Sequence, residues 1–268
     1  MSAPYLPPLD ALLALGRPEV DSRLTQPDYL AMGFTGEDVP ELIRMATDAE
    51  LADGDDDAAE TYAGIYAWRM LALLRAEAAI EPLIGHLGET DDEWALDELP
   101  EVLGMIGPAA LEPLRAALAR WSLQRESWVA GAAASGLVEV AARFPETRDA
   151  AVAALARQLR WWARHDPKLN TLLVADLVAL RAVEAAPVIE EAFAADAVDT
   201  RWFADDWEDV QVALGLLPER ITPRPSFMPP SRLRPTAVRL APAPAPAVVP
   251  KRRRKAEKAA RQRNRKRR

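Results

Sequence analysis

Two segments near the middle of the chain decide the fold: "AAIEPLIGHL" at 78–87 and "AALEPLRAAL" at 109–118. Laid over each other they match at positions 31 residues apart, and their apolar residues form one stripe of an α-helix. A proline near the start of a helix is tolerated because the first-turn amides have no partner within the helix. The matched pairs are Ala79 and Ala110, Ile80 and Leu111, Pro82 and Pro113, Leu83 and Leu114, and Leu87 and Leu118.

Weaker copies follow at 150–159 and 185–193, so the copies begin at intervals of 31 to 41 residues. Each copy is preceded by another predicted helix with its own apolar stripe. One such pair cannot bury its stripes alone, so a repeat of this period predicts a stacked α-solenoid. An ordinary helical bundle is the alternative. The preceding stripes are Ala67/Leu71/Leu74, Leu99/Leu103/Ile106, Ala133/Leu137/Val140 and Leu173/Leu177/Leu180.

Further helices are expected at both ends of the repeats. "TGEDVPELIRMATDAEL" at 35–51 predicts a helix with Thr35 as its cap, and a final helix is expected at about 207–216. Such end units cover the last apolar face of a repeat stack. The predicted organisation is all-α: capping helices at 1–56, a HEAT-like solenoid at 57–217, a Pro/Ala-rich linker at 218–250 and a basic tail at 251–268.

The charges of the chain are strongly segregated. The net charge of the whole chain is −8, yet the tail "KRRRKAEKAARQRNRKRR" at 251–268 contains 12 Lys or Arg residues. Residues 1–217 carry 39 acidic and 16 basic side chains, a formal charge of −23. The segment 218–250 holds 10 of the 23 prolines and should be an extended, polyproline-like linker. This pattern predicts an interaction tail attached to an acidic body.

The repeats resemble those of bacterial HEAT-like proteins, which are related to the repeats of phycobilisome bilin lyases. The resemblance rests on "YAWRMLALLRAEAAIEPLIGHL", "LPEVLGMIGPAALEPLRAAL" and "DWEDVQVALGL", and covers roughly residues 35–217. It implies an α-solenoid used for protein contacts and brings no catalytic residue with it. Some similar proteins end in a cysteine-rich metal motif of the SEC-C type. This chain has no cysteine and carries the basic tail instead.

The residue types available for catalysis or metal binding are few. Without cysteine the chain has no disulfide, no thiolate zinc site and no cysteine nucleophile. His86 and His165 do not fall in a metal-ligand spacing, and no phosphate-binding glycine motif is present. The acidic stretch 51–60 resembles a calcium loop but lacks the required glycine and the final glutamate. We therefore predict no catalytic residue, no metal and no cofactor.

Near the end of the body, "ADDWEDV" at 204–210 combines acidic and aromatic side chains. One interpretation is a contact surface for a basic partner, formed by Trp202, Asp205, Asp206 and Trp207. The other is a negatively charged first turn of the last helix, with the tryptophan buried.

The tail has three candidate roles. Its cations can bind RNA, the ribosome or another polyanion non-specifically through the phosphates. It can fold onto the acidic body, or it can be a solvated end. The predicted function is a non-enzymatic, cytoplasmic protein-interaction scaffold without a membrane segment; a bilin-lyase-like or chaperone-like factor and a self-regulated solenoid are the alternatives. The predicted polyanion-binding residues are Lys251, Arg252, Arg253, Arg254, Lys255, Lys258, Arg261, Arg263, Arg265, Lys266, Arg267 and Arg268.

Overall fold

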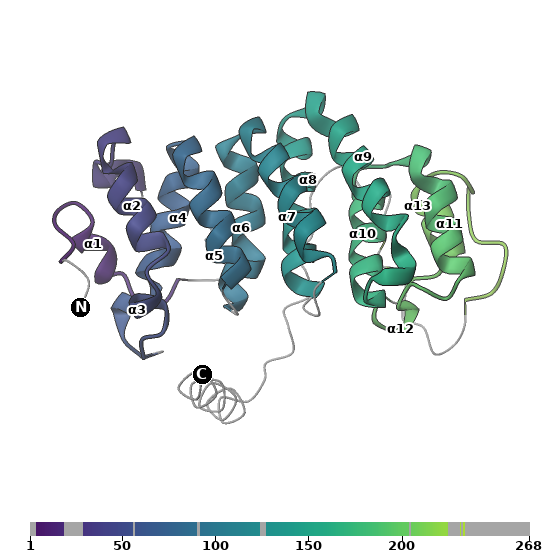
Figure 1. The fold of residues 1–268 in the computed structure, drawn as a ribbon, viewed down its shortest axis with the longest axis horizontal. Coiled ribbons are helices and arrows are strands. Elements are labelled where there is room, and N and C mark those ends of the chain that lie inside the picture. Colours follow the sequence, from purple (N-terminus) through teal and green to yellow (C-terminus); the bar gives the residue numbers. More distant parts are fainter. Residues whose placement is uncertain are drawn as a thin grey trace. The chain divides into compact units, whose positions relative to one another are not determined.

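The computed structural model contains thirteen α-helices and no β-strand in the residues that it describes (Figure 1). The prediction of an all-helical chain is confirmed for this part. All described residues belong to one compact unit, Met1–Ala237. The described residues are 4–18, 29–55, 57–89, 92–123, 127–203, 205–224, 231 and 233.

Five helices form a first row, in which each helix contacts the next one in the row: α2 with α4, α4 with α6, α6 with α8 and α8 with α10. Buried leucines recur every four residues, about one turn, at Leu99 and Leu103 in α6 and at Leu169, Leu173 and Leu177 in α10. One apolar side of each helix therefore faces the neighbouring helices. The row consists of α2 (Val39–Ala46), α4 (Ala63–Leu73), α6 (Glu93–Ile106), α8 (Ser127–Arg143) and α10 (Pro167–Ala179).

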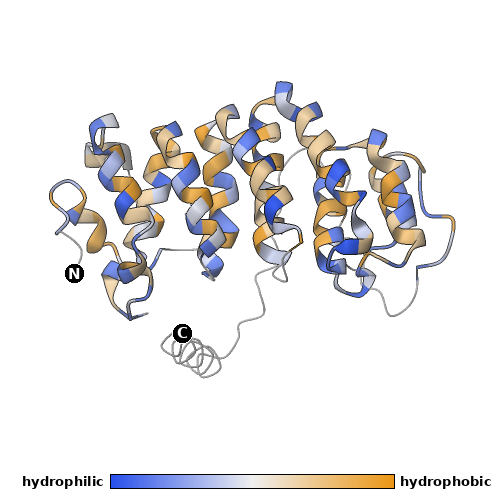
Figure 2. Cartoon of the chain, in the orientation of Figure 1, coloured by the Kyte–Doolittle hydropathy of each residue, from blue (hydrophilic) through white to orange (hydrophobic). Residues whose placement is uncertain are grey.

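Four helices form a second row in the same way, with contacts between α5 and α7, α7 and α9, and α9 and α11. The two rows meet through contacts such as α5 with α6, α7 with α8 and α9 with α10. Hydrophobic and hydrophilic residues alternate around these helices, as Figure 2 shows. The second row consists of α5 (Ile80–Glu89), α7 (Leu111–Trp121), α9 (Arg148–Leu159) and α11 (Ala186–Ala194).

The four predicted helix pairs are therefore present as α4 and α5, α6 and α7, α8 and α9, and α10 and α11. Pro82 and Pro113 each occupy the third position of their helix, within the first turn as expected. The leucines of the predicted stripes are almost all buried, and Leu71, Leu83, Leu103 and Leu114 have 0% exposure.

A short connection joins the helices of every pair, at residues 74–79, 107–110, 144–147 and 180–185. It ends in a single 3-10 turn directly before the second helix, at Glu77–Ala79, Pro108–Ala110, Pro145–Thr147 and Val183–Ala185. In three of the connections the backbone passes through positive φ, at Arg75 (48°), Gly107 (142°) and Arg181 (52°). The last residue of each 3-10 turn is small and buried, which allows the second helix to pack against the rest of the core. These residues are Ala79, Ala110, Thr147 and Ala185.

At the N-terminal end, Thr35 caps a structure that differs slightly from the prediction. Its side chain forms a capping box with Asp38 around the 3-10 turn Gly36–Asp38, and α2 begins directly afterwards. The short helices expected before residue 34 are represented by α1 (Asp10–Leu13) and the 3-10 turn Tyr29–Met32. A further short helix, α3 (Ala49–Ala52), and the 3-10 turn Ala59–Tyr62 precede α4.

At the C-terminal end, α12 (Thr200–Phe203) contacts α10, and α13 (Trp207–Ala213) contacts α11. The expected last helix is thus present but ends before Gly215, whose φ of 76° favours glycine. None of the helices described is both long and apolar enough to cross a lipid bilayer.

Candidate functional site: an acidic cluster bound by arginines

Four acidic side chains gather around the beginning of α13: Asp205, Asp206, Glu208 and Asp209, which we call the α13 carboxylate cluster. Asp206 and Asp209 form a capping box, in which each side chain accepts a hydrogen bond from the backbone amide of the other (3.1 and 3.0 Å). Two of the acidic residues are therefore needed to begin the helix.

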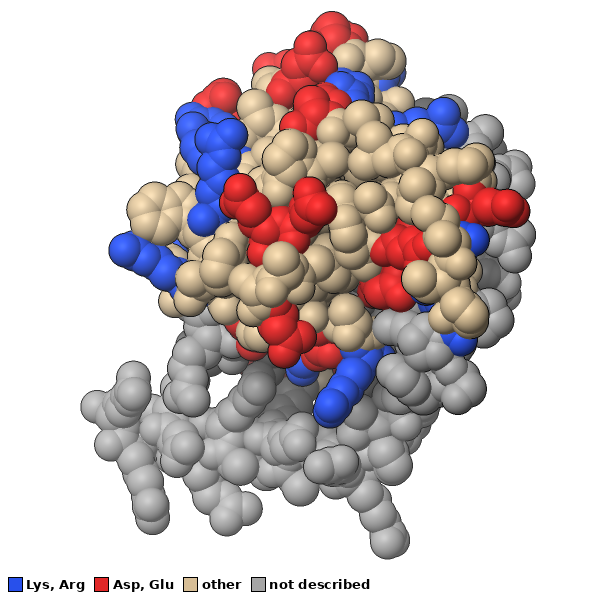
Figure 3. Space-filling model, turned by 90° about the vertical axis from the view of Figure 1, so that its right-hand side faces the viewer, with Lys and Arg blue, Asp and Glu red and all other residues tan. Residues whose placement is uncertain are grey.

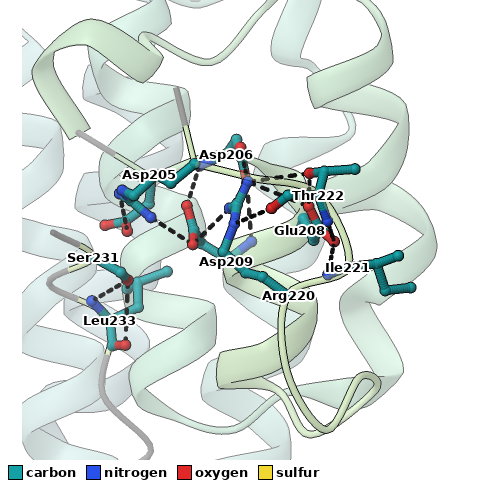
Figure 4. Close-up of polar contacts among 10 residues, drawn as sticks. Asp205, Asp206, Glu208, Asp209, Arg220, Ile221, Thr222, Ser231 and Leu233 are labelled. Carbon is teal, nitrogen blue, oxygen red and sulfur yellow. Dashed lines mark hydrogen bonds and ion pairs between the residues drawn. The ribbon is translucent and has the colours of Figure 1, made fainter. Parts of the chain in front are cut away.

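The cluster is bound by a part of the chain that was expected to be a free linker. Residues 218–224, which we call the arginine segment, lie against α13, and Figure 4 shows Arg220 directed at the carboxylates. Arg224 also binds the cluster, through Asp209. The remainder of the predicted linker, except Ser231 and Leu233, lies outside the described residues.

Arg220 bridges three of the four carboxylates. Its Nη1 and Nη2 atoms lie 2.6 and 2.9 Å from the two oxygens of Asp206, a bidentate pair. Nη1 also lies 2.7 Å from Asp209 Oδ1, and Nη2 lies 3.2 Å from Glu208 Oε2. These contacts, with Asp206 contributing most, raise the pKa of Arg220.

Arg224 reaches the carboxylates that are least accessible to solvent. Its Nη1 lies 2.6 Å from Asp209 Oδ1 and its Nη2 lies 3.3 Å from Asp205 Oδ1. The side chains of Asp205 and Asp209 are only 0% and 3% exposed. A buried carboxylate without a cation would be strongly destabilising, so Arg224 is needed for this packing.

The backbone between the two arginines is also held. Glu208 accepts hydrogen bonds from the Thr222 amide (2.9 Å), the Ile221 amide and the Thr222 hydroxyl group. The Thr222 hydroxyl contributes most to lowering the pKa of Glu208. The segment is thus attached at two side chains and at the backbone between them.

The pKa values of the cluster reflect the balance between burial and the arginines. Burial raises the pKa of Asp206, but the hydrogen bonds from Arg220 and from the Asp209 amide outweigh burial and place it below its usual value. For Asp205 burial prevails and raises the pKa, although Ser231 and Arg224 act in the opposite direction. Asp206 therefore ionises at a lower pH than Asp205 does.

The two tryptophans predicted as contact residues differ in their surroundings. Trp207 is half-buried and packs against Phe193 of α11, with ring centres 6.0 Å apart. Trp202 is 42% exposed and meets the exposed Trp128 of α8 edge to face, with ring centres 5.5 Å apart. Of the four predicted contact residues, only Trp202 offers much of its side chain to solvent.

Arg220 and Arg224 were not among the predicted site residues, because both fall within the segment 218–250 that was predicted to be a linker. A signal was present, because two arginines four residues apart follow an acidic cluster within 20 residues. The twelve predicted tail residues, Lys251 to Arg268, lie outside the described residues.

The end of the body on which α11 to α13 lie shows separate groups of acidic side chains, with basic ones mostly towards its margin (Figure 3).

The two histidines are placed in the packed body. His165 is buried, with Gln158 and Asn170 each 3.1 Å from one ring nitrogen, and His86 is half-buried 6.2 Å from the ring of Trp68. Burial lowers the pKa of both. Among the residues placed by the structure, no group of three His, Asp or Glu side chains could hold a metal ion.

Comparison with known proteins finds no matching family model, curated sequence or solved structure. The resemblance to HEAT-like repeats therefore stays a prediction from the sequence.

Proposed function

We propose that the chain is a HEAT-like α-solenoid that serves as a non-enzymatic protein-interaction scaffold in the cytoplasm. Its basic tail, residues 251–268, adds non-specific affinity for RNA, the ribosome or another polyanion.

The observation that carries this proposal is the arrangement of the helices in two rows. Helices in each row contact their neighbours in chain order, from α2 to α10 and from α5 to α11. Such an arrangement leaves a continuous surface along each row, which repeat proteins use to bind partners. The contrast between a body of −23 and a tail with 12 cations supports a separate electrostatic role for the tail.

The role of the tail is tested by deleting residues 251–268 and measuring the binding of a labelled single-stranded RNA by fluorescence anisotropy. We expect the deletion to weaken binding at least about tenfold, because the tail supplies the phosphate contacts. Binding by the full chain should also fall steeply between about 50 and 200 mM NaCl, since phosphate contacts release counterions.

A chain whose tail has the same composition in shuffled order is the matched control. It should bind RNA as well as the natural chain does, because phosphate contacts do not depend on the order of the cations. RNA affinity that is unchanged by the deletion, or insensitive to salt, would contradict the proposed role.

A second candidate function is a solenoid that is regulated by its own tail. The contacts of Arg220 and Arg224 with α13 favour it, since they bring the first cations after the body onto an acidic surface. Cross-linking of tail lysines to acidic residues of the same molecule should then occur at low salt and disappear at high salt. Cross-links that form only between molecules, or none at all, would rule this function out.

A further inference from the structure

The arginine segment is held by charge far more than by apolar packing. Its apolar side chain, Ile221, is 77% exposed, and the segment contains no helix. The two arginine side chains remain 18% and 19% exposed. Salt weakens the contact of Arg220 with the partly exposed Asp206, because the Debye length falls from about 10 Å at 0.1 M to about 3 Å at 1 M, whereas the buried pairs of Arg224 are screened less. The segment can therefore leave α13 without exposing a hydrophobic core.

The α13 carboxylate cluster, in contrast, is unstable without bound cations. It has four carboxylates and two bound arginines, and Asp205 and Asp209 are buried. The Ser231 hydroxyl lies near Asp205, but within the described chain no hydrogen bond reaches Asp205 Oδ2. A buried acceptor of this kind is available to a further donor. Departure of the arginine segment would therefore favour the entry of another basic group.

The geometry of the cluster selects arginine. Asp206 receives both Nη atoms of Arg220, and the guanidinium group of Arg224 spans Asp209 and Asp205. A planar guanidinium fork matches such bidentate contacts, whereas the ammonium group of lysine presents its three donors from a single nitrogen and lacks this geometry. Glu208 also accepts hydrogen bonds from the backbone amides of Ile221 and Thr222, which lie between the two arginines.

We propose that the α13 carboxylate cluster is a binding site for protein segments with two arginines four residues apart, and that residues 218–224 occupy it in cis as a displaceable strap. The partner is a basic segment of a protein that, like residues 221–223, is not helical between the two arginines. This site is separate from the basic tail, so it does not depend on which ligand the tail binds.

The test uses the full chain with Arg220→Gln and Arg224→Gln, which vacates the cluster. A fluorescent peptide with the sequence of residues 216–233 is the probe, and its binding is measured by anisotropy. We expect the variant to bind it one to one and at least about tenfold more tightly than the natural chain, a difference of about 1.4 kcal/mol. The natural chain should bind weakly because its own segment fills the site.

Two controls separate this site from general attraction to an acidic body. The variant Arg115→Gln with Arg157→Gln loses the same two charges on α7 and α9, and it should bind the peptide no better than the natural chain. A peptide with lysine at both arginine positions keeps the charge but should bind the vacated chain markedly less well. Equal binding to all three chains, or no binding to a folded vacated chain, would overturn the proposal.

If the vacated chain does not fold, hydrogen exchange of the natural chain tests whether the arginine segment can leave α13. The amides of Ile221 and Thr222 should lose protection between about 0.1 and 1 M NaCl, while those of α8 should keep it. Protection of Ile221 and Thr222 that persists at high salt would show that the segment is not displaceable, and the proposal would fail.

Discussion

At the level of single residues, Gly104 allows α6 and α8 to approach each other closely. A Cβ atom at this position would lie 2.6 Å from Glu139 Cβ and 2.9 Å from the backbone carbonyl carbon of Glu139. The backbone of α8 cannot move aside as a flexible side chain could. We expect Gly104→Ala to lower the free energy of unfolding by roughly 1–3 kcal/mol, despite the better helix propensity of alanine. Urea unfolding measures this change.

Gly85 in α5 provides the matched comparison, because a Cβ atom there would meet nothing within 4 Å. Gly85→Ala should raise the free energy of unfolding by roughly 0.5–1 kcal/mol, since only helix propensity changes. If both substitutions had the same sign, close packing would not be the reason for Gly104.

The carboxyl group of Asp176 in α10 lies in an environment that disfavours its ionised form. Its Oδ1 lies 3.5 Å from the Ser135 hydroxyl of α8, and no hydrogen bond reaches Oδ2 from the described residues. Burial, with a smaller contribution from the charge of Glu139, raises its pKa well above the usual value. The folded chain therefore holds this proton at pH values where the unfolded chain releases it.

The sign of the pH dependence follows from this difference. Above about pH 4, where an unfolded aspartate ionises, the contribution of Asp176 to stability falls until the pH passes its folded pKa. We expect Asp176→Asn to stabilise the chain at pH 7, and the gain to shrink as the pH approaches 4. Thermal unfolding of both chains at several pH values checks this, and a gain independent of pH would contradict it.

At the level of elements, a buried ion pair joins α4 and α6. Arg69 donates to Glu98 through Nη2 (2.6 Å) and Nε (2.8 Å), and both side chains are almost inaccessible, at 0% and 4% exposure. Trp68 Nε1 lies 3.4 Å from the same carboxylate. Two neighbouring helix pairs, α4 with α5 and α6 with α7, are thus connected by this ion pair.

Removing one member of this pair should be costly. Glu98→Ala leaves the Arg69 charge buried, so we expect a loss of roughly 3–5 kcal/mol in the free energy of unfolding. Replacing both residues by apolar ones, Arg69→Met with Glu98→Leu, should recover most of this loss. Chemical denaturation of the three chains provides the measurement.

An exposed ion pair provides the control. Glu112 and Arg115 are one turn apart on α7 and have side-chain exposures of 66% and 38%. Glu112→Ala should lower the free energy of unfolding far less than Glu98→Ala does, because exposed pairs contribute little. A loss as large as that of Glu98→Ala would show that burial is not what makes the Arg69–Glu98 pair important.

At the level of the whole body, each helix of the two rows contacts mainly the helices beside it, in its own row or in the other row. Helices α6 and α8 have neighbouring helices on both sides. Helices α1 and α12 are short and lie near the two ends of the helical rows. Stability in such an arrangement is approximately the sum of local terms. We expect hydrogen exchange to be slowest in α6 and α8 and fastest in α1 and α12. Uniform protection across the helices would instead indicate a single cooperative unit.

The sequence could predict those features of the structure whose signal lies within a few neighbouring residues of the chain. The helix pairs were predictable because an apolar stripe and a first-turn proline are local features, as at Pro82 and Pro113. The acidic turn before α13 was predictable for the same reason, since Asp206 and Asp209 cap the helix within one turn. The sequence could not assign Arg220 and Arg224 to this turn, because proline-rich composition indicates only an extended backbone and not what it contacts.

The sequence by itself thus determined the helical class, the pairing of helices and the segregation of charge, all of which depend on residue order and composition. Only the tertiary structure decided that Arg69 meets Glu98, that Asp176 is buried beside Ser135, and that the arginines after the last helix fill its acidic turn. The physical reason is that such contacts join residues that come together only when helices pack. Their energies depend on burial, which the spacing of residues along a chain does not reveal.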